Sequence, residues 1–175
     1  MDAGDPRARL LGVYDRALPE VYGYLLARCG RRWLAEDLTA EVFLAAVDTI
    51  RRDNPPTISV PWLIGTARHK LVDHWRRQAR EDRSLRTVVT DPTGPGVTDD
   101  PWDVQLDALR ARAVLDQLGP HHRAALTLRY LDDLPVPQVA TVLGRTLHAT
   151  EALLVRARTA FRGAYTATGE EDDGD

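Results

Sequence analysis

The chain has 175 residues, 43% of them apolar and 28% charged, which is typical of a soluble globular protein with one ordinary domain or two small ones. Its single cysteine, Cys29, excludes an internal disulfide and a multi-cysteine zinc site, and its five histidines form no HExxH or Cys/His cluster, so we expect neither metal nor cofactor. The net charge of −3 argues against a free-standing basic DNA binder, while the lack of a long apolar run or a signal-peptide core predicts a cytoplasmic protein without membrane insertion.

The first half of the chain has the spacing of three helices. Residues 11–29 form the first, whose apolar face comprises Leu11, Tyr14, Leu18, Val21, Tyr22 and Leu25. Pro19 predicts a kink or a break within it. Residues 32–50 form the second, with one side made of Leu34, Leu38, Val42, Ala45, Ala46 and Thr49. Two prolines make Asn54–Thr57 a loop. The third helix runs from about Pro61 to Arg80, with an inward face of Leu63 or Ile64, Ala67, Leu71 and Trp75.

Residues 81–103 are rich in Pro, Gly, Thr and Asp, which predicts a flexible linker. A second domain follows, and its first helix has an apolar face of Leu106, Leu109, Ala113, Leu115 and Leu118 and ends at Gly119-Pro120. Residues 121–131 form the next helix, which buries Ala125, Leu128 and Leu131. A short helix over residues 135–143 ends at Gly144, and Thr146 can cap a last helix that runs to about Tyr165. We expect an all-α fold with domains at 8–80 and 104–165 and a disordered acidic tail at 166–175.

The segment LPVPQVATVLG followed by RTLHATEALLVRARTAFR has the spacing of a helix-turn-helix. Val139, Ala140 and Leu143 would pack inside against Ala149, Leu153 and Leu154 of the second helix. The N-terminal part of such a helix can enter the major groove of DNA. A helical hairpin with a solvated basic face is the alternative that the segment alone leaves open.

The segment PWLIGTARHKLVDHWRRQAR combines five basic residues with an aromatic residue near its start. This pattern suits unpaired nucleic acid, because aromatic rings stack on bases and cations neutralise phosphates. We expect Trp75 in the core, whereas Trp62 fits a buried or a base-stacking position equally well. Charge elsewhere is segregated as well: residues 35–50 hold four acids and no base. Several surfaces with different partners are therefore expected.

Together these segments resemble the sigma-70 family of RNA polymerase sigma factors, and specifically its extracytoplasmic-function (ECF) group. AEDLTAEVFLAA resembles the polymerase-binding segment, PWLIGTARHKLVDHWRRQAR the segment that reads and melts the −10 element, and residues 118–162 the domain that reads the −35 element. The resemblance covers residues 8–165 and lacks the middle domain of larger sigma factors. It implies a sigma-2-like bundle and a sigma-4-like helix-turn-helix domain, with no catalysis of the chain's own.

The resemblance also implies partners and site residues. The partners are core RNA polymerase, through its β′ clamp helices and β flap, promoter DNA and an anti-sigma protein, with no small-molecule substrate. Polymerase would meet Asp37, Leu38, Glu41, Val42 and Phe43. The −10 element would meet Asn54, Ser59, Trp62, Arg68, His69, Lys70, Asp73, His74, Arg76 and Arg77. The −35 element would meet Arg145, Thr146, His148, Thr150, Glu151, Arg156 and Arg158.

The chain departs from the family's usual residues at four positions. The family commonly has Gln at Ala40, Asn at His69, Lys near Glu151 and Arg near Leu153. The last two departures weaken phosphate contact, although glutamate can accept a hydrogen bond from cytosine N4. An unusual −35 sequence is therefore expected.

A stand-alone helix-turn-helix regulator is the main alternative, but it leaves the acidic helix and the tryptophan-capped basic helix unexplained. An enzyme is not supported, because the sequence has no Gly-rich phosphate loop, metal cluster or nucleophile–base pair. Cys29 could be a redox sensor or an ordinary buried residue, and the latter is the commoner case.

Overall fold

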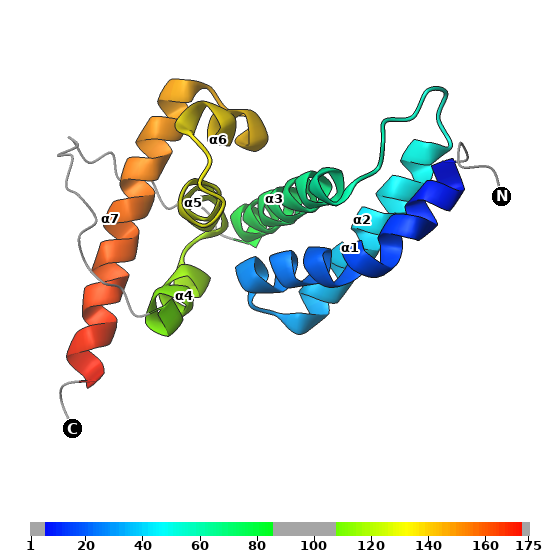
Figure 1. Ribbon diagram of the computed structural model, residues 1–175. Coiled ribbons are helices and arrows are strands. Elements are labelled where there is room, and N and C mark those ends of the chain that lie inside the picture. The colour runs from blue at the N-terminus through cyan, green and yellow to red at the C-terminus, as the bar shows by residue number, and fades with distance from the viewer. Residues whose placement is uncertain (1–5, 86–107, 173–175) are drawn as a thin grey trace. The chain divides into compact units, whose positions relative to one another are not determined.

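The computed structural model describes residues 6–85 and 108–172 (Figure 1). Within these ranges all regular structure is helical: α1 (Pro6–Cys29), α2 (Arg32–Ile50), α3 (Val60–Leu85), α4 (Ala108–Gln117), α5 (Pro120–Leu126), the π-helical turn η1 (Thr127–Leu131), α6 (Val136–Leu143) and α7 (Leu147–Asp172). The chain divides between His74 and Trp75 into two compact units, so α3 contributes to both. The predicted all-α fold is confirmed. None of the helices in the described ranges has both the length and the apolar character needed to cross a bilayer.

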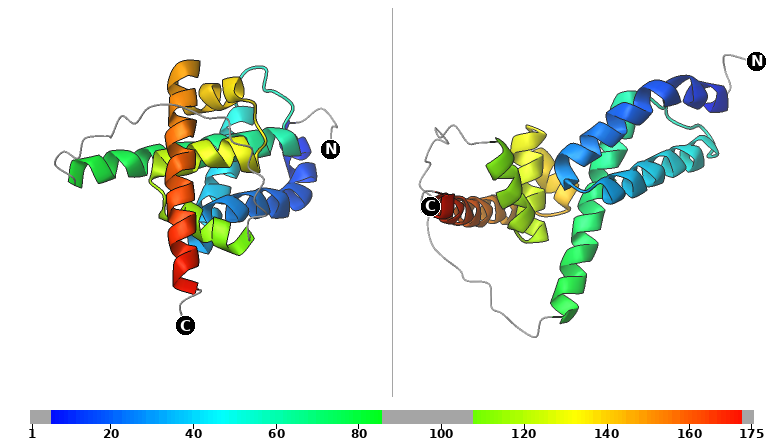
Figure 2. Two further views of the ribbon diagram at one scale, coloured as in Figure 1. Left: turned by 90° about the vertical axis from the view of Figure 1, so that its left-hand side faces the viewer. Right: turned by 90° about the horizontal axis from the view of Figure 1, so that it is seen from below.

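Helices α1 and α2 form an antiparallel hairpin in the first unit (Figure 2, right). The turn between them uses Gly30, whose φ of 69° lies in the left-handed region that glycine adopts without a Cβ clash. Val21 and Leu25 of α1 and Leu38 and Val42 of α2 are completely buried. Of the predicted kink or break at Pro19, the break is excluded, since α1 continues through this residue. Pro19 lies on the solvent side, where water can replace the missing hydrogen bond.

The buried face of α1 differs in part from the predicted one, because Val21 and Leu25 are buried as expected but other members of the predicted face are not. Leu11 is 69% exposed and Tyr14 is 39% exposed, whereas the core receives Leu10, Ala17, Val21, Leu25 and Cys29. Both sets have helical spacing and lie on adjacent stripes of the helix. Periodicity alone cannot tell which of two neighbouring apolar stripes meets the rest of the fold. Part of the apolar surface of α1 is therefore open to solvent. The buried position of Cys29 agrees with its interpretation as a core residue.

Helix α3 begins after an irregular segment that contains the predicted proline loop. The Trp62 backbone N–H donates to Ser59 Oγ at 3.4 Å, which caps the start of the helix. The predicted inward residues Leu63, Ala67, Leu71 and Trp75 are all buried, and Leu63 rather than Ile64 takes the first of these positions. The helix continues to Leu85, so it enters the segment predicted as linker; residues 86–107 lie outside the described ranges.

In the second unit, α7 packs along α4, α5 and α6 (Figure 2, left). Val114 of α4 joins Leu126, Ala157 and Phe161 in a buried cluster. The predicted face of α4 is wrong in part, because Leu109 and Ala113 are exposed and Val114 takes the inward position; Leu106 lies outside the described residues. Burial of Ala125 and Leu128 is confirmed.

The end of α5 and the end of α7 also differ from the predictions. Helix α5 passes into the π-helical turn η1, and this change of register leaves Leu131 exposed instead of buried. Helix α7 continues past Tyr165 to Asp172, into the segment predicted as a disordered tail. Of the predicted helix-turn-helix core, Val139, Ala140, Leu143, Leu153 and Leu154 are buried, and Ala149 is half-buried.

Gly144 ends α6, as the sequence predicts, and its φ of 63° lies in the left-handed region. Replacing Gly144 by alanine is expected to lower the free energy of unfolding by about 1–2 kcal/mol, because a Cβ atom strains this left-handed conformation. Thermal unfolding followed by circular dichroism measures the change. Gly163→Ala is the matched control, because Gly163 is exposed within α7 and a Cβ atom there would meet no atom within 4 Å. That variant should be unchanged or slightly more stable. Equal losses in both variants would contradict the prediction.

Candidate polymerase and nucleic-acid interfaces

An exposed stripe runs along α2. Trp33, Asp37, Ala40 and Leu44 follow one another at spacings of three and four residues and are all exposed. Trp33 is 60% exposed and Leu44 is 64% exposed, which is unusual for large apolar side chains placed in one line. Sequence reasoning missed both, although the spacing from Asp37 would have placed them on the same face. We call these four residues the α2 stripe.

Two residues predicted to contact polymerase do not lie on this surface. The side chains of Leu38 and Val42 are fully buried between α2 and its neighbours, on the side of the helix opposite the α2 stripe. These two side chains pack α2 against the rest of the unit. Because they are buried, they do not contribute to the exposed surface of α2, contrary to the prediction that they contact polymerase. Asp37 is exposed as expected.

Glu41 and Phe43 lie at the two edges of the exposed side of α2. A carboxylate oxygen of Glu41 lies 3.3 Å from Lys70 Nζ of α3, so an acid predicted for polymerase and a base predicted for DNA form an ion pair. Phe43 packs edge-on against Tyr14, with ring centroids 4.9 Å apart. Both residues are half-buried, and both contribute to the packing of α2.

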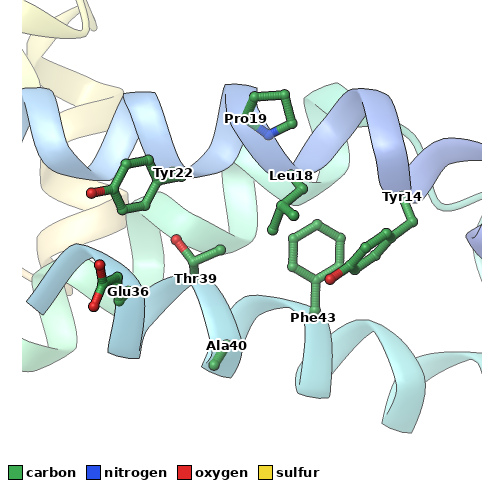
Figure 3. Close-up of a pocket in the computed structure, with 8 residues that line it drawn as sticks. All are labelled: Tyr14, Leu18, Pro19, Tyr22, Glu36, Thr39, Ala40 and Phe43. Atoms are coloured by element: carbon green, nitrogen blue, oxygen red, sulfur yellow. The ribbon is translucent and has the colours of Figure 1, made fainter. Parts of the chain in front are cut away.

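A groove lies between α1 and α2 beside the α2 stripe (Figure 3). Its volume is about 500 Å³, and its lining comprises Tyr14, Leu18, Pro19, Tyr22, Glu36, Thr39, Ala40 and Phe43. Phe43 and Tyr14 meet at one end, and Tyr22 and Glu36 lie toward the other. The Thr39 hydroxyl donates to the Ala35 carbonyl at 2.6 Å, so its hydrogen atom is already bonded within α2. Ala40 belongs to both the groove and the α2 stripe.

The loop before α3 has an exposed tip and an anchored end. Asn54, Pro56 and Thr57 are exposed, and Asn54 has a φ of 57°. Ile58 is buried, and Ser59 is engaged in capping α3. Ser59 therefore acts first as a structural residue, while Asn54 stays accessible to a ligand. Trp62 is half-buried at the start of the helix.

Of the eight α3 residues predicted to bind the −10 element, five share one face of the helix. At 100° per residue, one side of the helix carries Trp62, Thr66, His69, Asp73, Arg76, Arg77 and Arg80. Lys70 lies at the margin of this face. Arg68 and His74 project to other sides of the helix and are half-buried, so they do not belong to the face. Within the second unit, Arg76 Nη2 also donates to the Val142 carbonyl at 2.9 Å.

The helix-turn-helix presents the start of α7. Thr146 Oγ1 accepts the Ala149 backbone N–H at 3.2 Å, which confirms the predicted cap. Thr150 is fully buried and its hydroxyl donates to the Thr146 carbonyl at 2.9 Å, so its predicted contact with DNA is corrected. Leu153, whose apolar side chain was expected to weaken phosphate contact, is in the core.

The outward face of α7 has an apolar and acidic start and a basic continuation. Leu147, His148 and Glu151 lie at its N-terminal end, and Arg158 and Arg162 follow on the same side. Sequence reasoning missed Leu147, which is 47% exposed, and Arg162. Arg158 Nη1 donates to the Tyr130 hydroxyl at 3.4 Å, so the tyrosine ring adjoins this face. Arg145 is half-buried before the helix, and Arg156 is half-buried toward its flank.

His121 of α5 lies partly buried near this domain's basic residues. Burial lowers the pKa of His121 below 6.5, and the positive charge of Arg145 lowers it further. The unfolded chain therefore takes up a proton near pH 6.5 that the folded chain resists, so stability is complete above that pH and falls as the pH drops below it. The histidine is expected to remain neutral in the folded protein at neutral pH.

Replacing His121 by glutamine is expected to reduce the loss of stability between pH 7.5 and pH 5.5. Urea unfolding at the two pH values measures the free energies of unfolding of the wild type and the variant. His148→Gln, at an exposed position of α7, is the control and should behave as the wild type does. An undiminished pH dependence in His121→Gln would contradict the assignment.

Comparison with known families identifies both units. Residues 13–81 match the family described as Sigma-70 region 2, and residues 108–161 match Sigma-70, region 4. The first match covers the hairpin and α3, and the second covers α4 to the middle of α7. The α2 stripe and the exposed face of α3 therefore lie in the first region, and the start of α7 lies in the second.

Relatives match the chain across most of its length. The chain is 32% identical over 152 residues to the ECF RNA polymerase sigma factor BldN of Streptomyces coelicolor, a match that covers 83% of the chain and 56% of BldN. It is 30% identical over 173 residues to the ECF RNA polymerase sigma factor SigC of Mycobacterium tuberculosis, covering 99% of the chain and 90% of SigC. The sigma factor RpoE of Bartonella quintana, crystallised with the anti-sigma factor NepR, has a similar fold, with a TM-score of 0.53 and 18% identity over 91% of the chain and 96% of RpoE. The chain therefore belongs to the ECF group of the sigma-70 family, whose non-enzymatic members bind core RNA polymerase and promoter DNA and direct transcription initiation.

Proposed function

We propose that the chain acts as a sigma factor through three separate surfaces: the α2 stripe for core polymerase, the loop tip and exposed face of α3 for the −10 element, and the start of α7 for the −35 element. The α2 stripe is the observation that carries this assignment. Trp33 and Leu44 are exposed to solvent on the same side of α2 as Asp37. Large apolar side chains grouped on an exposed surface are typical of a site that a protein partner covers. The β′ clamp helices are the proposed partner of the stripe, and the β flap that of the second unit.

The −10 surface has the composition required for melted DNA. Asn54 at the exposed loop tip is placed to meet an extruded base, and Trp62 offers a partly exposed ring at the start of α3. The cations Arg77 and Arg80 continue the same face and can neutralise phosphates, while Arg76 must exchange its bond with the Val142 carbonyl for such a contact.

The −35 surface separates base reading from phosphate binding. Leu147 can contact a thymine methyl, and Glu151 can accept from cytosine N4, whereas Arg158 and Arg162 are suited to the backbone. His148 and Arg145 flank the base-reading end. This division supports a promoter element that contains T and C on the strand read by the helix.

An anti-sigma protein and a cytoplasmic location belong to the same proposal. The fold relative from Bartonella quintana was crystallised with an anti-sigma factor, which makes regulation by such a partner a reasonable expectation for this chain. A subunit of RNA polymerase works where the chromosome is transcribed, which in a bacterium is the cytoplasm.

Reconstitution with purified core RNA polymerase tests the proposed function. Core polymerase with the full chain should start transcription at defined positions on a subset of promoter fragments, and either component alone should not. Run-off transcripts from a pooled promoter library, mapped at their 5′ ends, give the measurement. Tight binding of the chain alone to duplex DNA, with no effect of polymerase, would instead indicate a stand-alone regulator and contradict the proposal.

A further inference from the structure

The groove between α1 and α2 has walls that suit a planar cation. Three aromatic side chains, Tyr14, Tyr22 and Phe43, line it, and the carboxylate of Glu36 lies at the end where Tyr22 stands (Figure 3). Aromatic faces attract cations, and a guanidinium both stacks on rings and pairs with a carboxylate. The remaining lining is largely apolar, which suits the aliphatic stem of a long side chain.

Large apolar side chains that the hydrophobic core does not bury surround the groove. Leu11 and Tyr14 continue along the edge of α1, and Trp33 and Leu44 lie on α2. Four of the large apolar side chains that the described residues leave exposed thus belong to this one hairpin. Such a concentration on one hairpin is typical of a surface that a partner covers.

The groove and the α2 stripe form one continuous surface, because Ala40 belongs to both and Glu36 is the neighbour of Asp37. We propose that the groove receives an arginine side chain from a helix of core RNA polymerase, so that the polymerase interface extends from α2 onto α1. This inference rests on the proposed function and assigns a second helix and a specific chemistry to its docking surface. Ala40 matters here because its short side chain leaves the groove open toward the stripe.

Filling the groove tests the proposal. Ala40→Trp should weaken binding of the full chain to core polymerase by about tenfold or more, because a large side chain at the mouth excludes the arginine. Glu36→Lys should have a similar or larger effect, and Glu36→Gln a smaller one, because the carboxylate that pairs with the guanidinium is reversed or neutralised. Titration of fluorescently labelled chain with core polymerase gives the dissociation constants.

Ala27→Trp is the matched control, because Ala27 is exposed on α1 but does not line the groove. Thermal unfolding should be unchanged in all four variants. Wild-type affinity in both Ala40→Trp and Glu36→Lys would overturn the proposal while leaving the sigma-factor function intact. Failure of the wild-type chain itself to bind core polymerase would instead overturn the proposed function.

The occupant is identified by cross-linking. A photo-reactive phenylalanine in place of Tyr22, in the full chain bound to core polymerase, should cross-link to the β′ subunit, and the peptide recovered should contain an arginine in a helix. A cross-link to another subunit, or the absence of a cross-link in a complex that has formed, would overturn the proposal. So would a cross-link between two copies of the chain without polymerase, since it would show that the groove serves self-association.

Discussion

Replacing Trp33 by alanine is expected to weaken binding of the chain to core RNA polymerase by about 30- to 700-fold. A central aromatic residue of an interface contributes about 2–4 kcal/mol when truncated, and each 1.4 kcal/mol is a factor of ten. Trp33 is exposed in the free chain and packs little against its own fold, so its removal should cost binding without costing stability. Equilibrium titration with core polymerase measures the first, and thermal unfolding measures the second.

Substitutions of charged residues on the α1–α2 hairpin are compared with Trp33→Ala. Asp37→Ala should have a smaller effect, about three- to tenfold, which shrinks at high salt because it removes an exposed charge. Glu20→Ala is the matched control on the other side of α1 and should bind as the wild type does. Glu41 is a poor choice for such a test, because its ion pair with Lys70 links α2 to α3 and mixes folding with binding. Unaltered affinity in Trp33→Ala would show that polymerase does not use the α2 stripe.

Replacing Glu151 by glutamine is expected to change the base preference of the reconstituted holoenzyme at one position of the −35 element from C toward A. Glutamate accepts from cytosine N4, whereas glutamine pairs with the N6 and N7 groups of adenine, and such a contact discriminates by about 1–3 kcal/mol, or roughly 5- to 150-fold. Glu151 is exposed one turn into α7, where no core contact restrains it. Sequencing the transcripts made from a promoter library with a randomised −35 element measures the preference.

Two further substitutions separate recognition of the bases of the −35 element from binding to the DNA backbone. Leu147→Ala should relax the preference for T at an adjoining position, while Arg158→Ala should weaken transcription from all −35 sequences to a similar degree. Glu20→Gln makes the same chemical change as Glu151→Gln on the other unit and should leave the preference unaltered. An unchanged base preference in Glu151→Gln would show that the N-terminal end of α7 does not read this position.

Much of the fold could be predicted because local chemistry determines where several of the helices begin or end, although the ends of α3, α5 and α7 differ from the predictions. The bounds of α2, the proline loop, the stop at Gly144 and the cap at Thr146 all follow from the conformations that single residues prefer. The order of the polymerase-binding, −10 and −35 segments can also be predicted from the sequence, because the three segments differ in amino-acid composition. The family resemblance rests on these local features, and the comparisons confirm it.

Tertiary structure alone decided which side of α1 and of α4 faces inward, whereas the inward sides of α2 and α3 could be predicted from the sequence. Helix α1 carries apolar residues on two adjacent stripes, and a spacing of 3.6 residues fits either one. Packing buried Leu38, Val42 and Thr150, which were expected at interfaces, and left Trp33, Leu44 and Leu147 exposed. Contacts between helices also decided that Glu41 pairs with Lys70 and that α1 and α2 enclose a groove. The sequence by itself thus determined the helices, their order and the family, whereas the residues that face the partners depend on burial, which is a property of the assembled bundle.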